Sequence, residues 1–314
     1  KRYHIAPVWR AEKAQRGRFR EFWQCDADIV GTASAHADAE ALIMVSEILD
    51  AAQLPSAVIR ISHRRLLEGI ARIAGISDEL APTVYRAVDK LDKIGAGGVL
   101  TELRDAGVGE TPALKLLDMI SQRGSPTELL ASLRTVADQH HETLTALDNL
   151  ADVFAIIDAV APDREPFVLD LTLARGLDYY TGIVYEATVE RPKIGSVSGG
   201  GRYDGLVGMF AGREIPAMGV SIGLERILEV TEEFHLVTTP TSVCDAIIVF
   251  RDDAFLDAAR LARRLRLEGM NIDLSLVSKK SLGDQLKYAD RRGIPWAIVL
   301  GQDEIAAGQA TLKN

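Results

Sequence analysis

The chain has 314 residues, of which 47% are apolar and 26% charged, a composition typical of a globular protein with roughly two or three domains. Its net charge of −9 argues against a protein that coats nucleic acid non-specifically. No apolar run reaches the roughly 20 residues of a membrane-spanning helix, so we expect no membrane partner. Cys25 and Cys244 form neither a disulfide framework nor a CxxC pair, which favours a reducing cytoplasm. The histidines lack metal-ligand spacing, so no protein-held metal is expected.

The chain begins with a predicted antiparallel hairpin. Residues 3–9 and 19–30 have the pattern of strands, and the polar loop between them carries a basic tip that contains glycine. A helix is expected over residues 38–52, because Leu42, Val45 and Leu49 recur on one face. Residues 1–60 therefore predict the first part of a domain built on an antiparallel sheet.

Residues 61–165 have an almost entirely helical pattern. Ser62 is a candidate N-cap for the first helix, and Pro82 opens the next. Two more helices are expected near residues 111–122 and 126–160. This block interrupts the β-rich parts, so we predict a helical insertion domain over residues 61–165.

Strand patterns resume in residues 166–237, at 167–172, 183–189 and 194–199. The glycine run 199–201 permits either close approach of a ligand to the backbone or a tight bulge. The small apolar residues 217–223 predict a strand that runs into a helix and places Arg226 at the helix start. We assign 166–237 to the second part of the sheet domain.

Residues 244–314 predict a further domain. Strands near 245–250, 271–276 and 295–300 alternate with helices near 253–268 and 281–292, which indicates a mainly parallel sheet. No GxGxxG follows the first strand, so a dinucleotide site is not expected. The chain as a whole is predicted to be α/β, with an α+β sheet domain, a helical insertion and a C-terminal α/β domain.

Three arginines, Arg10, Arg175 and Arg226, stand beside glycines or at predicted strand and helix ends. The chain has no GxxxxGK[ST] P-loop, and guanidinium groups on an antiparallel sheet are another way to hold a triphosphate, because their forked donors match phosphate oxygens. Residues 174–182 add two consecutive tyrosines to one of these arginines. That segment suits a small zwitterionic or aromatic ligand, and it equally suits a core strand with a buried tyrosine pair.

Together these segments resemble the class II aminoacyl-tRNA synthetases, and within them the histidyl-tRNA synthetase family. Residues 10–24 resemble motif 2 of the class, and residues 219–226 resemble the GxGxER start of motif 3. Residues 175–181 (RGLDYYT) and the glycine run with residues 202–205 (RYDG) resemble the two histidine-specific elements of the family. The last domain resembles the class IIa anticodon-binding module. The resemblance implies ATP-dependent formation of histidyl-adenylate and transfer of histidine to the 3′ end of tRNA(His).

The resemblance also implies a role for each matching residue. Arg10 and Arg175 would be the catalytic cations, and Arg10 would also belong to the ATP site with Glu12, Arg18, Phe22 and Arg226. The histidine site would comprise Arg175 with Gln24, Asp28, Tyr180, Gly200, Gly201 and Tyr203. Lys13, Gln15 and Arg16 would reach the acceptor end of the tRNA. Mg²⁺ would arrive on ATP, and the complete protein is expected to be a homodimer in the cytoplasm.

Several alternatives stay open from the sequence. Trp23 is predicted to pack in the sheet core, and Tyr179 to be buried on the strand face opposite Tyr180. Asp28 stands where the family usually has glutamate, which shortens its reach by one methylene. A catalytically silent relative is the rival function, either a regulatory subunit of ATP phosphoribosyltransferase or a tRNA-sensing domain.

The ends of the chain differ from the family pattern. Motif 1 and the element preceding motif 2 are not in the sequence, and the last domain stops in its predicted fourth strand, at residues 309–314. We therefore expect the chain to be incomplete at both ends. A polypeptide limited to residues 1–314 is expected to form no stable dimer and to catalyse only weak histidine-dependent pyrophosphate–ATP exchange.

Overall fold

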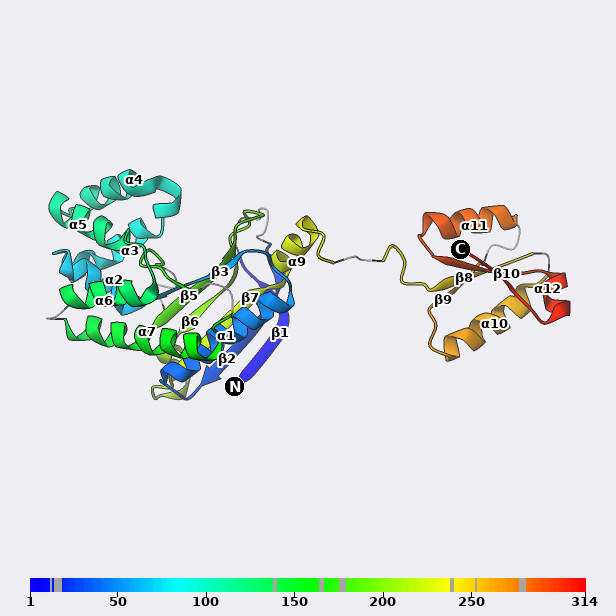
Figure 1. Ribbon diagram of the computed structural model, residues 1–314, viewed down its shortest axis with the longest axis horizontal. Coiled ribbons are helices and arrows are strands. Elements are labelled where there is room, and N and C mark those ends of the chain that lie inside the picture. Colours follow the sequence, from blue (N-terminus) through cyan, green and yellow to red (C-terminus); the bar gives the residue numbers. More distant parts are fainter. Residues whose placement is uncertain are drawn as a thin grey trace. The chain divides into compact units, whose positions relative to one another are not determined.

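The computed structural model of the chain describes residues 1–314 except 12, 14–18, 138–139, 164–166, 175–178, 238–239, 252 and 277–280. The described residues divide into two compact units, Lys1–Leu236 and Val237–Asn314 (Figure 1). Each unit has hydrophobic clusters of its own. The finer division into segments 1–60, 61–165, 166–237 and 244–314 stays a prediction.

The first unit is built on one mixed sheet. Among the described residues, its seven strands lie in the order β1-β2-β7-β6-β5-β3-β4. Every neighbouring pair is antiparallel except β3 and β4. The strands are β1 (Arg2–Trp9), β2 (Glu21–Val30), β3 (Ala57–His63), β4 (Phe167–Leu169), β5 (Ile183–Val189), β6 (Ser196–Arg202) and β7 (Ala217–Gly223). The predicted antiparallel sheet is confirmed.

The predicted N-terminal hairpin is also confirmed. Strands β1 and β2 pair from Arg2 opposite Asp28 to Trp9 opposite Glu21. The backbone N–H of Arg10 then donates to the carbonyl of Arg20 at 2.9 Å, which extends the pairing by one step. Arg10 is therefore held at the end of a rigid pair of strands.

The prediction that Trp23 packs in the sheet core is wrong. Its side chain is 46% exposed, and it lies opposite Pro7 on β1, an edge strand of the described sheet. Side chains alternate between the two faces of a strand, so Phe22 and Gln24 point to the other face. The sequence pattern could not tell which face of the hairpin is covered.

Helix α1 (Ala35–Ala51) covers part of the sheet and contacts β7 and α7 (Figure 1). Leu42, Val45 and Leu49 are buried, as the predicted apolar stripe requires. Ser34 caps the helix by accepting from the N–H of His36. Two short helices, α8 (Asp204–Ala211) and α9 (Leu224–Glu233), follow β6 and β7 directly.

Residues 64–160 supply a group of helices beside one end of the sheet (Figure 1). Their bounds are α2 (Arg64–Ile73), α3 (Ala81–Val88), α4 (Leu91–Asp105), α5 (Glu110–Ile120), α6 (Pro126–Val136) and α7 (His141–Val160), with a 3-10 turn at Asp78–Leu80. The single helix predicted over 126–160 is thus two helices. Helix α4 was not predicted, and Gly95 inside it has φ +68°, which interrupts the helical pattern.

The prediction that Ser62 caps the first of these helices is wrong. Ser62 lies inside β3, and His63 is the N-cap of α2, with its Nδ1 accepting from the N–H of Arg65 at 3.1 Å. Residues 57–63 carry the β-branched pattern Val-Ile-x-Ile, which favours a strand. Its partners, β4 and β5, come more than a hundred residues later, so local pattern did not reveal the pairing.

His63 makes the stability of the first unit depend on pH. Burial, aided by the charges of Arg65 and Arg202, lowers the pKa of His63 to about 3. In the unfolded chain the pKa of this histidine is near 6.5. Below that pH, His63 therefore binds a proton in the unfolded chain and remains neutral in the folded one. The contribution of neutral His63 to the free energy of unfolding is fully present above about pH 6.5. It decreases by about 1.4 kcal/mol for each pH unit as the pH falls toward 3.

The variant His63→Asn keeps a capping side chain but removes the titration, so it is expected to lose less stability on acidification. The measurement is the free energy of urea unfolding at about pH 7 and about pH 5.5, within the range where histidine titrates. An equal loss in the variant and in the wild type would show that His63 is not the titrating group.

The second unit is a four-stranded α/β domain in the order β11-β10-β8-β9 among the described residues. Its elements are β8 (Ala246–Phe250), α10 (Phe255–Leu267), β9 (Ile272–Leu274), α11 (Leu282–Arg291), β10 (Trp296–Leu300), α12 (Gln302–Ala307) and β11 (Thr311–Lys313). The strands β8, β9 and β10 are parallel, and β11 is antiparallel to β10. The predicted βαβαβ order is confirmed.

Within the described parts of both units, every helix is too short or too polar to cross a membrane.

Candidate functional site

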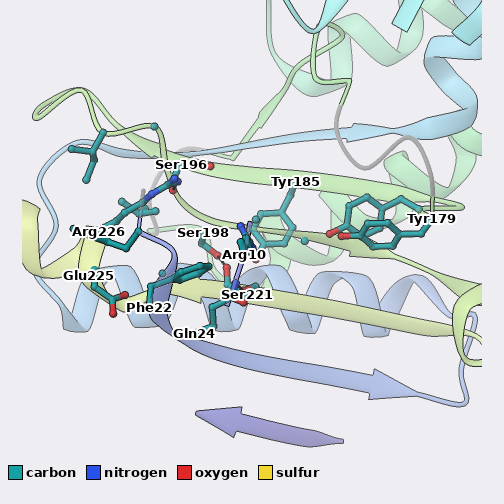
Figure 2. Close-up of a pocket in the computed structure, with 18 residues that line it drawn as sticks. Arg10, Phe22, Gln24, Tyr179, Tyr185, Ser196, Ser198, Ser221, Glu225 and Arg226 are labelled. Carbon is teal, nitrogen blue, oxygen red and sulfur yellow. Dashed lines mark hydrogen bonds between the residues drawn. The ribbon is translucent and has the colours of Figure 1, made fainter. Parts of the chain in front are cut away.

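A cavity of about 360 Å³ opens on the sheet of the first unit, and its volume is in the range of small-molecule sites (Figure 2). Strands β2, β5, β6 and β7 and the start of α9 supply most of its wall. The lining residues are Arg10, Phe19, Phe22, Gln24, Tyr179, Tyr180, Tyr185, Ile194, Gly195, Ser196, Val197, Ser198, Gly199, Gly200, Ser221, Gly223, Glu225 and Arg226.

The cavity joins three segments that the sequence singled out separately. The lining residues that were also predicted site residues are Arg10, Phe22, Gln24, Tyr180, Gly200 and Arg226. Asp28, Gly201 and Tyr203 lie outside the lining. In Figure 2 the cavity extends from Arg226 and Glu225 at one end to Tyr179 at the other.

The end of the cavity near α9 is cationic. Arg226 lies in the first turn of α9, and its Nη1 donates to the carbonyl oxygen of Ser196. The guanidinium carbon of Arg10 lies 4.8 Å from the centre of the Phe22 ring, a cation–π distance. Two guanidinium groups and an aromatic face at one site suit a ligand with phosphates and a flat ring.

Glu225 is a lining residue to which the sequence reading gave no role. Its Oε1 accepts from the backbone N–H of Trp23 at 2.6 Å, which ties the start of α9 to strand β2. Its Oε2 is buried and has no hydrogen-bond partner among the described residues. The position of Glu225 directly before Arg226 in the GxGxER pattern was a signal that could have identified it.

The opposite end of the cavity is aromatic. The rings of Tyr179 and Tyr180 lie with centroids 4.2 Å apart, and burial raises the pKa of the Tyr180 hydroxyl. The prediction that Tyr179 is buried is wrong, because it is 46% exposed and lines the cavity. The two tyrosines lie between 175–178 and β5, where the chain does not keep the alternation of a strand.

The glycine run lets the backbone of β6 approach its neighbours closely. A methyl group built on Gly200 would lie 2.2 Å from the carbonyl oxygen of Gly219, and one on Gly201 would lie 3.0 Å from the ring of Tyr180. Any larger side chain at these positions would displace a strand or the tyrosine. The close neighbours of this run are thus adjacent strands and Tyr180, and close approach of a ligand to its backbone stays a prediction.

Asp28 contacts Tyr203 and Arg2 beside the cavity. It accepts from the hydroxyl of Tyr203, and its other oxygen lies 3.4 Å from Nε of Arg2. Burial and this carboxylate raise the pKa of Tyr203, so the tyrosine stays a proton donor. Asp28 therefore fixes the orientation of Tyr203. Its side chain, one methylene shorter than that of glutamate, is long enough for this contact.

Arg202, between the glycine run and Tyr203, is the centre of a buried polar cluster. Its Nη2 donates to Asp38 at 2.7 Å, and its Nη1 donates to Asp204 at 3.1 Å and to the carbonyl of Thr32 at 3.0 Å. The side chain of Arg202 is 7% exposed and that of Asp38 is fully buried. The carbonyl of Arg202 accepts from the N–H of Thr181 at 2.8 Å, so the cluster also holds the chain that follows Tyr180.

The chain before residue 175 is anchored in a similar way. Asp170 accepts from the N–H and the hydroxyl of Thr172 at 2.8 and 2.6 Å, and from the guanidinium of Arg60. Burial raises the pKa of Asp170, but the Thr172 bonds and the Arg60 charge outweigh it, and the net pKa is lowered. The ionised carboxylate fixes the turn that leads into the RGLDYY segment.

Five predicted site residues, Glu12, Gln15, Arg16, Arg18 and Arg175, lie outside the described residues. Lys13 is described and is exposed. Within the described residues, no group of three or more His, Cys, Asp or Glu side chains is placed to hold a metal ion.

Comparison with known proteins shows the family of the chain. The family model for histidyl-tRNA synthetase matches residues 1–227, and that for an anticodon-binding domain matches residues 245–314. The chain is 43% identical to the histidine–tRNA ligase of Aeropyrum pernix, covering 100% of this chain and 71% of that protein. For the histidine–tRNA ligase of Cytophaga hutchinsonii the identity is 39%, with 100% and 69% covered.

Solved structures of histidyl-tRNA synthetases also resemble this chain. The crystal structure of histidyl-tRNA synthetase from Nostoc sp. PCC 7120 superposes with a TM-score of 0.85 at 31% identity, covering 100% of this chain and 73% of that one. An ATP phosphoribosyltransferase regulatory subunit/histidyl-tRNA synthetase from Bacillus halodurans C shares the fold, with a TM-score of 0.73 at 22% identity over 91% of this chain and 70% of that one. With a family model that matches most of its length, the chain belongs to the histidyl-tRNA synthetase family.

Proposed function

We propose that this chain catalyses the reaction for which its relatives are named, joining histidine to tRNA(His) in two steps. In the first, the carboxylate of histidine attacks the α-phosphate of ATP, forming histidyl-adenylate and releasing pyrophosphate. In the second, histidine passes to the 3′ end of the tRNA. The observation that carries the proposal is the single cavity in which Arg10, Phe22 and Arg226 meet Gln24 and Tyr180.

The cationic end of the cavity would hold ATP. Phe22 would stack on adenine, with Glu12 reading its edge, while Arg226 and Arg18 would bind the β- and γ-phosphates. Arg10 would contact the α-phosphate. Mg²⁺ would enter with ATP and neutralise part of the phosphate charge.

The aromatic end would hold histidine. Gln24 would bind the amino-acid backbone, and Tyr180 would border the imidazole with Tyr203, which Asp28 orients. Gly201 leaves space for the ring of Tyr180, and Gly200 would present its backbone at the cavity wall.

Arg175 would lie opposite Arg10 and offset the repulsion between the histidine carboxylate and the α-phosphate. Adenylation brings two anions together, so fixed cations beside them would lower its barrier.

The partners follow from the same family membership. The hairpin tip with Lys13, Gln15 and Arg16 would contact the acceptor end of the tRNA, and the unit that matches an anticodon-binding domain would contact its anticodon. We propose a homodimer for the complete protein, acting in the cytoplasm. We also propose that residues 61–165 form an insertion within the catalytic domain, 1–60 and 166–237.

The rival function is a catalytically silent relative. The regulatory subunit/synthetase from Bacillus halodurans C is only 22% identical to this chain, so the likeness indicates a shared fold and does not indicate a shared function. Arg10 and Arg226 line one cavity with Phe22, which favours a site that binds ATP over a silent one.

Aminoacylation of purified tRNA(His) by the full-length protein tests the proposal. We expect charging that requires histidine and ATP together. A protein that binds tRNA but forms neither adenylate nor charged tRNA would be a silent relative.

A further inference from the structure

Ser221, in the middle of β7, uses both of its oxygens beside the cavity. Its Oγ accepts a hydrogen bond from the amide Nε2 of Gln24 at 2.5 Å. Its carbonyl oxygen accepts one from the Oγ of Ser198 at 2.9 Å. All three residues line the cavity (Figure 2). Strands β2, β7 and β6 are thus joined through one serine.

A buried tyrosine completes this chain of hydroxyl groups. The hydroxyl of Tyr185 lies 2.8 Å from the Oγ of Ser198, and Tyr185 is fully buried. A serine hydroxyl has one hydrogen, and that of Ser198 is donated to Ser221, so Tyr185 must be the donor to Ser198. Burial raises the pKa of Tyr185, which keeps this proton in place. The backbone at Ser221 is therefore held from the side opposite Gln24.

The bond to Ser221 decides what Gln24 offers to a ligand. A glutamine amide has one acceptor oxygen and an NH₂ group. With Nε2 directed to Ser221, the amide carries its acceptor Oε1 on the side away from Ser221. A carbonyl oxygen accepts hydrogen bonds from an ammonium group and cannot accept one from an ionised carboxylate, which has no hydrogen to donate.

We propose that Ser221 is a positioning residue that turns Gln24 into an acceptor for the α-ammonium group of the amino-acid substrate. This inference rests on the proposed function, since it takes histidine as the ligand. Ser221 does not touch the substrate. It fixes the amide of Gln24 in one of two possible orientations, and Ser198 with Tyr185 keeps Ser221 in place.

The test compares three ligands in binding experiments on the full-length protein. Histidine carries both charged groups, histidinol carries the ammonium without the carboxylate, and imidazolepropionate carries the carboxylate without the ammonium. The variants are Ser221→Ala, Gln24→Ala and the double variant. Ser46→Ala is the matched control, because Ser46 is a buried serine of α1 whose hydroxyl has no partner among the described residues.

For Ser221→Ala we expect the Kd of histidine and of histidinol to rise about three- to tenfold, the usual effect of one lost hydrogen bond. The Kd of imidazolepropionate and the KM for ATP should not change. In the Gln24→Ala background the Ser221 substitution should have no further effect, because the two residues act as one unit. Ser46→Ala should behave as the wild type.

Two outcomes would overturn the inference. Weaker binding of imidazolepropionate with unchanged histidinol would mean that Ser221 donates to Gln24 and the amide faces the carboxylate. Additive effects in the double variant would mean that Ser221 acts without Gln24. Histidine binding without adenylate formation in the wild type would count against the proposed function alone, since the effect of Ser221 on binding would still be measurable.

Discussion

Replacing Arg10 with alanine is expected to lower the rate of histidine-dependent pyrophosphate–ATP exchange by about a hundred- to a thousandfold, the usual effect of removing one preorganised charge-stabilising donor. Arg10 is held at the end of the β1–β2 hairpin and lines the cavity beside Phe22. Under the proposed function, its guanidinium would contact the α-phosphate, where charge develops as the histidine carboxylate attacks. The effect should be on kcat more than on the KM for histidine.

Arg10→Lys is the matched control for this prediction. Lysine keeps the charge but loses the forked donors, so its activity should lie between those of the wild type and the alanine variant. The thermal unfolding midpoints of all three proteins should agree, because Arg10 lies on the wall of a cavity. Exchange at the wild-type rate by Arg10→Ala would remove Arg10 from the mechanism.

Asp38→Ala is expected to destabilise the first unit by about 3–5 kcal/mol, because it leaves the buried guanidinium of Arg202 without its main counter-charge. Asp38 is fully buried and receives hydrogen bonds from both Nε and Nη2 of Arg202. The measurement is the free energy of urea unfolding. Because Arg202 also holds the chain after Tyr180, the KM for histidine should rise in the protein that remains folded.

Asp204→Ala provides the comparison, since Asp204 binds the same guanidinium with a side chain that is 32% exposed. Its loss should cost about 1 kcal/mol, because water can replace a partly exposed partner. Equal destabilisation by the two variants would mean that burial of Asp38 is not what makes the pair important.

The sequence predicted those parts of the fold whose signals are local. The β1–β2 hairpin, helix α1 and the βαβαβ order of the second unit follow from short periodic patterns and turn residues. Strand β3 was missed because its identity as a strand depends on β4 and β5, which are distant in the chain. The helix predicted over 126–160 was too long because the break between α6, which ends at Val136, and α7, which begins at His141, was not recognised.

In the candidate site, too, local signals were predicted and contacts between distant segments were not. Motif spacing predicted that Arg10, Phe22 and Arg226 act together, and they do line one cavity. It could not predict which tertiary partners orient the site. Gln24 and Ser221 are 197 residues apart, and Asp38 and Arg202 are 164 apart. The first pair depends on the register of β2 against β7, and the second on the packing of α1 against β6. The pattern of either segment alone specifies neither.

Histidine-dependent pyrophosphate–ATP exchange by the full-length protein is the most direct test of the central claim that the cavity forms histidyl-adenylate. We expect exchange when histidine is supplied and only background exchange with each of the other amino acids, and loss of the histidine signal in Arg175→Ala with the fold intact. Absence of exchange with histidine, or equal exchange with another amino acid, would contradict the account.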